Sequence, residues 1–399
     1  MASKRVVLAA LLVLAGSWVA VDLYTGSDRH TYKVGDNPKV TAVETLPDGG
    51  YLVGGHVRTG DGDSDAVVLR LDANRSLESV HRFGGDGDEE LSDLTRTRDG
   101  GFAFVGWRGE YDTSVGWIVN VDAKGDVIYD RQFGASTKDI DRVNAVVATD
   151  NGTITAVGRT SRGVSNGTGA VLYELNADGD VLLERVYETG ENRSTTAIVQ
   201  ASSGGYLIGG TDGHHPTVPQ YKTDETPSAW LARVAATGEL LWTQQTRRAV
   251  TRGIVHAHDN GYVVAVVDAT TGTLGRGMSL QRFDPQGDVV WTRDAEYTCS
   301  SEGNLLARST DGYVLVRETC SDDSPAKADA VIERWTTQGK LAWNRTYDDD
   351  DIGLGFSAVT TREDGTYVAA GTVDERIWLQ TVTASERVNE STATTNGGT

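Results

Sequence analysis

The chain has 399 residues, of which 57 are acidic and 37 are basic, and its formal net charge is −20 at pH 7. Nucleic-acid binding needs a basic surface, so this charge argues against a nucleic-acid partner and equally against an acidic one.

The N-terminus has the pattern of a targeting segment. Lys4 and Arg5 precede Val6–Val21, an apolar stretch of 16 residues without charge. This stretch is short for a membrane-spanning helix and typical of the apolar region of a signal peptide. Ala15-Gly16-Ser17 offers small residues for cleavage, although the apolar run continues past it. We therefore predict that residues 1–22 are a Sec-type signal peptide or an uncleaved membrane anchor. The rest of the chain would then be extracellular or at the cell surface, with membrane contact only through this segment.

Seven copies of a unit of about 50 residues follow, each marked by a small-polar turn and an apolar run. The copies are Asp48–Gly55, Asp99–Gly106, Asp150–Gly158, Ser203–Gly210, Asp259–Val264, Asp311–Val316 and Asp364–Gly371. Repeats of this length in strand-forming sequence indicate a propeller or a solenoid.

Each copy contains four short strand candidates, A to D. In the second copy these are 91–97, 102–107, 116–121 and 127–133. Asp-Gly and Lys-Gly-Asp turns between the apolar runs are typical of hairpins, because glycine accepts the positive φ that such turns need. Strand B is apolar throughout, which favours a strand covered on both faces, as in stacked blades.

The two ends of the chain favour a closed ring. The seventh copy has strands at 357–362, 367–371 and 376–382, but no fourth strand follows. Residues 29–36 resemble the strand-D endings of other copies, so we expect them to complete the last blade and remove its exposed edge. We predict an all-β fold, a seven-bladed β-propeller of four-stranded blades over 29–383, with 384–399 as a disordered polar tail. Another β-repeat architecture is the alternative.

The B–C and D–A connections vary in length and would share one face, called the top face here. Binding usually resides in variable loops on a rigid scaffold. The longest of these loops, 211–228, contains His214 and His215, which either ligate a metal or lie in an exposed loop without that role. His256 and His258 alternate on the fifth strand A and would share a face near the central channel, as a site or as structural residues.

The alternating acids Asp61, Asp63 and Asp65 lie in a predicted top-face loop. Hard cations want several carboxylate oxygens, so this cluster is a possible Ca²⁺ site. Ala66 stands where a calcium loop needs glycine, and no glutamate closes the loop. A solvated acidic loop is the competing interpretation.

The chain has two cysteines, Cys299 and Cys320, on either side of the predicted A–B turn of the sixth copy. We expect them to lie within disulfide reach at the open end of that hairpin, as an exported chain permits. Two unrelated thiols are the alternative.

Asn-x-Ser/Thr sequons are expected to be glycosylated in an exported protein, unless they reflect only the Thr-rich composition. They occur at Asn74, Asn151, Asn166, Asn192, Asn344 and Asn389.

Aromatic residues recur four positions after the glycine of the C–D turn, at Tyr129, Trp242, Trp291 and Trp343. This pattern resembles the tryptophan-docking repeat of PQQ-like (quinoprotein-type) β-propellers, in which the tryptophan packs on the neighbouring blade. The Gly-Gly after strand B is similar to kelch repeats. The excess of Asp and Glu over Lys and Arg resembles proteins of extreme halophiles, whose acidic surfaces stay soluble in molar salt.

The sequence contains no nucleophile elbow, metalloprotease helix or phosphate loop. The cofactor pocket and catalytic aspartate of quinoprotein enzymes are not matched either. We therefore expect a monomeric binding or scaffolding module that contacts a protein or glycan at the cell surface through its top-face loops. The alternative is an enzyme, either a quinone-cofactor dehydrogenase or a glycan-acting lyase or hydrolase.

Overall fold

The computed structural model describes residues 30–383 with thirteen short gaps. The gaps are 61, 111–112, 135–139, 150, 163, 165–166, 188–191, 214–226, 248, 269–275, 299–302, 320–327 and 349–352. It also describes the backbone of two strands near the N-terminus, β1 (Leu8–Leu14) and β2 (Ser17–Thr25).

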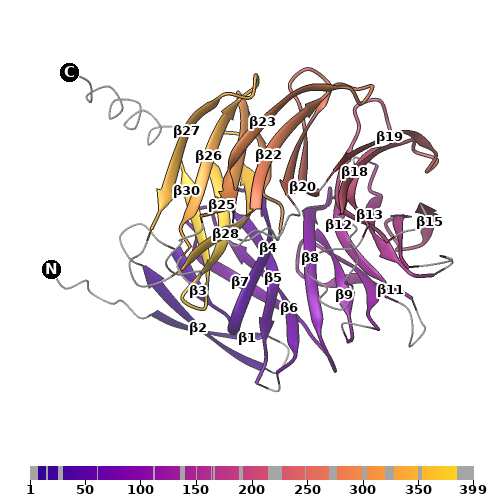
Figure 1. Ribbon diagram of the computed structural model, residues 1–399. Helices are drawn as coiled ribbons and strands as arrows, with labels where there is room; N and C mark the ends of the chain where they lie inside the picture. Colours follow the sequence, from indigo (N-terminus) through magenta and orange to yellow (C-terminus); the bar gives the residue numbers. More distant parts are fainter. Residues whose placement is uncertain are drawn as a thin grey trace, which may run out of the picture.

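The described residues form seven antiparallel sheets arranged around a common axis (Figure 1). The first blade consists of β4 (Asp36–Thr45), β5 (Tyr51–Arg58), β6 (Ser64–Leu71) and β7 (Leu77–Phe83). The second consists of β8 (Glu89–Arg96), β9 (Phe102–Arg108), β10 (Val115–Val121) and β11 (Val127–Phe133). The third consists of β12 (Arg142–Ala148), β13 (Ile154–Thr160), β14 (Gly169–Leu175) and β15 (Val181–Tyr187). The fourth consists of β16 (Arg193–Gln200), β17 (Tyr206–Asp212), β18 (Ser228–Val234) and β19 (Leu240–Arg247). The fifth consists of β20 (Ala249–His256), β21 (Tyr262–Asp268), β22 (Arg276–Phe283) and β23 (Val289–Thr298). The sixth consists of β24 (Leu306–Ser309), β25 (Gly312–Glu318), β26 (Ala330–Thr336) and β27 (Leu341–Tyr347). The seventh consists of β28 (Leu354–Thr361), β29 (Tyr367–Val373), β30 (Arg376–Val382) and β3 (His30–Lys33). The predicted seven-bladed propeller is confirmed.

The N-terminal strand closes the ring as predicted. In Figure 1 the indigo β3 lies beside the yellow β30, and Thr31 pairs with Trp378. The Tyr32 hydroxyl donates to the backbone oxygen of Arg75 in the first blade at 2.6 Å. Because β3 supplies the missing outer strand, the last blade gains its fourth strand from the front of the chain.

The last sheet differs from the expected four strands in one respect. β2 pairs with β3, and β1 pairs with β2, so this sheet has six strands. β1 falls within the segment 1–22 predicted as a signal peptide or anchor, and β2 begins within it and ends three residues beyond it. No helix among the described residues is long and apolar enough to cross a membrane. The export of the chain and its cell-surface location remain predictions.

The hydrophobic core lies between blades. Strand B of each blade is buried on both faces, as its continuous apolar run predicts; in β5 only Arg58 is exposed. Leu52 and Val68 of the first blade, for example, pack with Leu91 and Phe104 of the second. The blades are thus held as a stack in which each sheet covers its neighbour.

A β-bulge in the innermost strand explains the glycine that ends strand B. In the first blade the bulge lies at Thr41, between the paired residues Val40 and Ala42. A Cβ added to Gly55, the partner of Val40, would overlap the backbone oxygen of Lys39. Only glycine allows the two strands to pair so closely beside the bulge.

Candidate functional site at the inner strands

The inner strands β4, β8, β12, β16, β20, β24 and β28 contact one another in order, and β28 contacts β4. Six of them carry the same bulge, at Thr41, Ser92, Asn144, Thr196, Arg252 and Ser357. The bulged side chain often bridges to the next blade. The Thr41 hydroxyl donates to Leu91 O at 3.0 Å, and the Thr196 hydroxyl donates to Thr251 O at 2.7 Å. The bulge therefore joins successive blades around the axis.

Two acidic residues interrupt this repeat. The residue after the bulge is alanine or glycine in five blades, but in the second blade it is Asp93. The small residues are Ala42, Ala145, Ala197, Gly253 and Ala358. Glu44 occupies a position where the other inner strands carry apolar residues or threonine, such as Val147. We call Glu44 and Asp93 the acid pair.

The acid pair lies in surroundings that disfavour charge. Burial raises the pKa of Glu44 to about 7, against an opposing attraction from Arg96. Burial also raises the pKa of Asp93 to about 7, and the negative charge of Glu44 adds to this rise. Both side chains keep partial solvent access. Near neutral pH, therefore, the acid pair holds exchangeable protons.

Hydrogen bonds fix Asp93 between two blades. Its carboxylate oxygens accept from the backbone N–H of Leu94 at 2.9 Å and from that of Val146, in the third blade, at 3.0 Å. These bonds oppose the rise of its pKa but do not cancel it. The carboxylate of Asp93 is thus positioned by main-chain donors on two adjacent inner strands.

Two basic residues, Arg252 and Arg308, lie on the inner strands of the fifth and sixth blades. Arg252 stands at the bulge of the fifth blade, where the other bulges carry small polar residues. Arg308 on β24 of the sixth blade pairs with Tyr313, at the position that His256 holds in β20. After burial, its charge contributes to a lowered pKa of His256. The inner strands thus carry the acid pair and Arg96 in the first two blades, and Arg252 and Arg308 in the fifth and sixth.

The two histidines of the fifth blade do not form the shared site that their alternation suggests. His256 bonds to the backbone of Gln200 in the fourth blade. His258 lies in the following turn, with Nε2 3.3 Å from the backbone oxygen of Gly312 in the sixth blade. Each histidine turns toward a different neighbour, because the inner strand ends between them. His214 and His215 lie outside the described residues.

A B–C connection and a D–A connection meet on the top face, as expected for a propeller. The backbone N–H of Ser64, after the B–C connection of the first blade, donates to the Asp88 carboxylate in a D–A connection at 2.9 Å. Asp61 lies outside the described residues. Asp65 forms an ion pair with Arg82 at 3.2 Å, and Asp63 accepts from the Thr59 backbone N–H through its own backbone oxygen at 2.8 Å.

Calcium binding by the three acids stays a prediction. Among the residues that the structure describes, no three His, Cys, Asp or Glu side chains are grouped so that they could hold a metal ion.

Both cysteines lie outside the described residues, but the residues beside them meet. The Glu318 backbone N–H donates to the Thr298 hydroxyl at 3.4 Å. Cys299 follows the end of β23 and Cys320 follows β25 by two residues. The disulfide would therefore join the fifth and sixth blades; it stays a prediction.

The sequons differ in accessibility. Asn74, Asn151 and Asn344 are exposed, and Asn192 is half-buried. Asn166 and Asn389 lie outside the described residues. Asn344 lies on the outer strand β27 and still faces solvent. Glycosylation of all six stays a prediction.

The docking role of the aromatic residues is visible in the contacts of the turn glycines. An added Cβ on Gly287 would lie 2.9 Å from the Trp242 ring of the preceding blade. A Cβ on Gly339 would lie 3.0 Å from the Trp291 ring in the same way. Both glycines have positive φ, so the turn needs glycine for its backbone as well as for the ring that covers it.

Comparisons with known proteins identify no family. No family model matches the chain, and no curated protein matches it. Among solved structures, Sqt1 from Chaetomium thermophilum is 14% identical, with a TM-score of 0.48, over 84% of this chain and 80% of that one. Sqt1 bound to the N-terminus of the ribosomal protein L10 is 15% identical, with a TM-score of 0.48 and 84% of each chain covered. A glucose dehydrogenase is 11% identical, with a TM-score of 0.44, over 74% of this chain and 97% of that one. With identities and TM-scores this low, the partners and activities of these proteins do not carry over.

Proposed function

We propose that this chain is an exported binding and scaffolding module that holds a protein or glycan partner at the cell surface. The N-terminal segment 1–22 would direct export or tether it to the membrane. Partner contact would use the top-face loops together with polar groups at the inner strands. The acidic surface would keep the module soluble in high salt.

The observation that carries the proposal is the placement of charges that the propeller itself does not need. Ala or Gly serves in five blades at the position of Asp93, and a small polar residue serves in five at the position of Arg252. Half-burying a carboxylate costs stability unless it gains a partner. A ligand with a cationic group near the acid pair would compensate this cost, which favours a partner segment that carries an amine or a basic side chain.

Affinity capture with matched variants tests this proposal. Wild-type protein is immobilised and exposed to solubilised native envelope in molar salt, beside an E44Q/D93N variant and a control E363Q variant. Glu363 is an exposed acid on an A–B turn. We expect a component that wild type and E363Q retain and that E44Q/D93N loses. Identical retention by all three proteins would refute a binding role for the acid pair.

A second candidate function rests on the same carboxyls. Two acids with pKa values near 7 are suited to general acid–base chemistry, and perturbed acids cluster at functional sites. A glycan-acting enzyme would then release sugar fragments from envelope glycans. Product release by wild type that is abolished in both E44Q and D93N would favour this enzyme over the binding module.

A further inference from the structure

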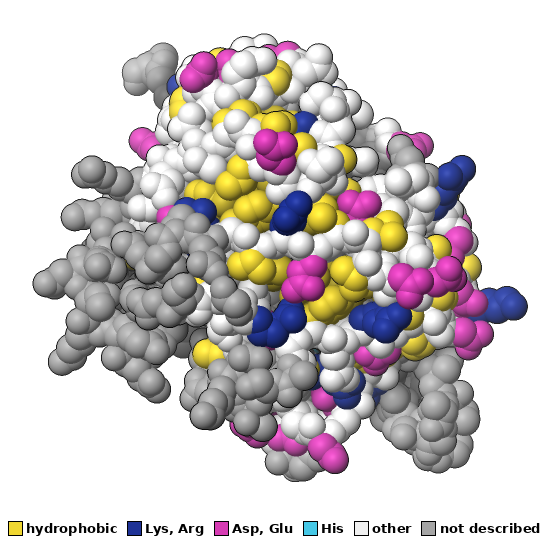
Figure 2. All heavy atoms as spheres, turned by 90° about the vertical axis from the view of Figure 1, so that its right-hand side faces the viewer, with side chains coloured by type: hydrophobic (Ala, Val, Ile, Leu, Met, Phe, Trp, Pro, Cys, Tyr) yellow, Lys and Arg dark blue, Asp and Glu magenta, His cyan; other side chains and the backbone are white. Residues whose placement is uncertain are grey.

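The outer rim of the ring carries an exposed apolar surface that the fold does not use. All ten large exposed hydrophobic side chains among the described residues lie on outermost strands. Five of them belong to β15 and β19, namely Val181, Leu182, Val186, Leu240 and Leu241. Figure 2 shows the side of the ring on which these strands lie, with apolar side chains gathered between charged ones. The third and fourth blades thus hold half of this exposed apolar set.

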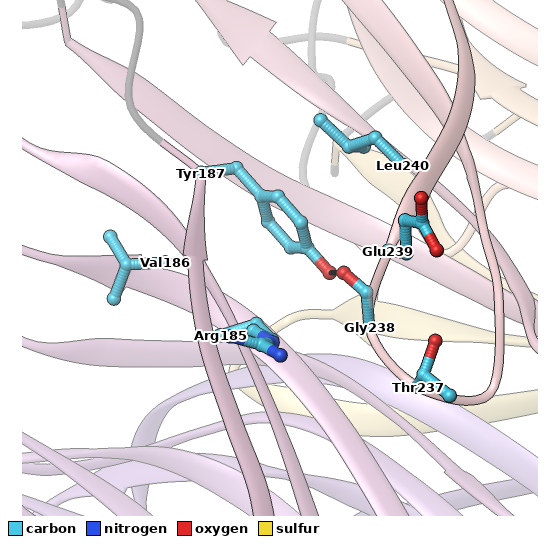
Figure 3. Close-up of a pocket in the computed structure, with 7 residues that line it drawn as sticks. All are labelled: Arg185, Val186, Tyr187, Thr237, Gly238, Glu239 and Leu240. Carbon is cyan, nitrogen blue, oxygen red and sulfur yellow. Dashed lines mark hydrogen bonds between the residues drawn. The ribbon is translucent and has the colours of Figure 1, made fainter.

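An open groove lies at the junction of these two blades. Arg185, Val186 and Tyr187 of β15 line one side, and residues 237–239 of the β18–β19 turn with Leu240 at the start of β19 line the other. Figure 3 shows the Tyr187 ring reaching across to Gly238, whose backbone oxygen accepts from the Tyr187 hydroxyl at 3.0 Å. Val186 points away from the turn, so Arg185 and Tyr187 face the groove from this strand.

The groove lies at the junction where the third blade lacks the Tyr or Trp that follows the turn glycine in other blades. Four residues after the turn glycine, the second, fourth, fifth and sixth blades carry Tyr or Trp, but the third blade carries Leu183. The contacts of the turn glycines show the consequence. Ring atoms are the nearest neighbours of the glycine at three junctions: the His81 ring at Gly125, the Tyr129 ring at Gly179 and the Trp242 ring at Gly287. At Gly339 the Trp291 ring lies at 3.0 Å, beside the Arg293 side chain at 2.9 Å. At Gly238 the nearest atoms belong instead to the Arg185 and Leu183 side chains.

We propose that this groove binds an aromatic side chain, preferably tryptophan, presented by a partner protein. The chain's own indoles show what fits such a junction, because Trp242 covers Gly287. The Trp242 indole N–H donates to Pro285 O, two residues before the turn glycine, at 3.3 Å. The equivalent acceptor in the groove is the backbone oxygen of Ala236.

The groove offers a planar ring three kinds of contact. The Arg185 guanidinium provides a cation–π surface, which favours an aromatic ring over an aliphatic side chain. Leu183 and Leu240 provide apolar contact at either side. A sugar would be less favoured, since sugars stack on exposed aromatic faces and the Tyr187 ring is buried. This site is separate from the acid pair and does not depend on the function proposed above.

Methyl-detected NMR with N-acetyl-L-tryptophanamide tests the proposal. We expect saturable shifts of the Leu183 and Leu240 methyl resonances with a millimolar Kd, as suits so small a ligand. N-acetyl-L-leucinamide and methyl β-D-glucoside serve as competing probes. Absence of saturable shifts with the tryptophan derivative, or stronger binding of either competing probe, would overturn the assignment.

Two variants separate docking from non-specific contact. L183W places an internal indole where the chain carries leucine and should weaken binding about ten-fold or more, the effect of losing one buried ring site. V290W adds an exposed indole at a junction that already has its ring, and should bind as wild type does. If L183W fails to fold, R185A provides the same test by removing the guanidinium. Wild-type affinity in the folded L183W or R185A protein would disprove the proposal.

Discussion

Replacing Glu44 with glutamine should change how the stability of this propeller depends on pH. In the unfolded chain Glu44 ionises near its ordinary pKa of 4.5, whereas in the folded ring its pKa is about 7. Between these values the folded state binds a proton that the unfolded state has lost, so folding stability falls as pH rises. This contribution is absent below about pH 4 and is fully unfavourable above about pH 7.

The magnitude follows from the size of the shift. Moving the pKa of a carboxyl from 4.5 to about 7 corresponds to roughly 3 kcal/mol. Glu44 keeps some solvent access, so we expect about 1–2 kcal/mol in practice. E44Q should therefore be about 1–2 kcal/mol more stable than wild type at pH 8 and nearly equal to it at pH 4. Removing the negative charge should also lower the pKa of Asp93, since Glu44 helps to raise it.

Urea unfolding at several pH values between 4 and 8, in constant molar salt, measures the difference directly. Molar salt suppresses the repulsion among surface acids and leaves the more buried acid pair less affected. The exposed E363Q variant removes one charge without removing a buried carboxyl, so its stability should stay parallel to that of wild type. An E44Q protein that is destabilised at pH 8, or one whose difference from wild type does not change with pH, would refute the reasoning.

Three further predictions concern the framework. Gly287→Ala should cost about 2–3 kcal/mol of folding stability, since the new Cβ meets an indole at 2.9 Å and φ is +93°. Gly204→Ala should cost only about 1 kcal/mol, because φ is +85° but nothing lies within 4 Å of the new Cβ. Equal losses of the two variants in denaturant unfolding would contradict this. Tyr32→Ala should cost about 3–5 kcal/mol of folding stability, because it removes a buried ring from the strand that completes the last blade. Tyr32→Phe should cost about 1 kcal/mol, because it removes only the hydrogen bond of the hydroxyl. An unchanged Tm in Tyr32→Ala would show that ring closure does not limit stability. A Cys299→Ser/Cys320→Ser variant should lose about 3 kcal/mol relative to the oxidised protein, and a mass spectrum showing two free thiols in the exported protein would disprove the bridge.

The repeat made the fold predictable in detail. The strands expected at 127–133 and 376–382 occur as β11 and β30 with the same bounds. Ring closure was also predictable, because a blade without a fourth strand leaves an edge that residues near position 30 can pair. These features follow from turn chemistry and from the need to cover both faces of each sheet.

The acid pair was not predicted, although a signal existed. A bulge places two residues opposite one, so the side chains beyond it change faces. Simple alternation along β8 therefore misplaces Asp93, which the bulge at Ser92 directs toward the third blade. Aligning the copies on the bulge would have shown an aspartate among alanines. The long top-face loops, in contrast, have no repeat to compare with and gave only compositional hints.

The departures from the repeat mark positions whose residues the shared packing of the blades does not require. Each blade packs against its neighbours in the same way, so a residue type found at one position in most blades is sufficient for the fold. The raised pKa values of Glu44 and Asp93 lower folding stability above about pH 7. The groove lies at the junction where the chain carries Leu183 instead of Tyr or Trp. Five other blades carry alanine or glycine at the position of Asp93, and four carry tyrosine or tryptophan at the position of Leu183. The two departures lie at separate places, the inner strands and the rim between the third and fourth blades, so the E44Q/D93N and L183W variants test them independently of each other.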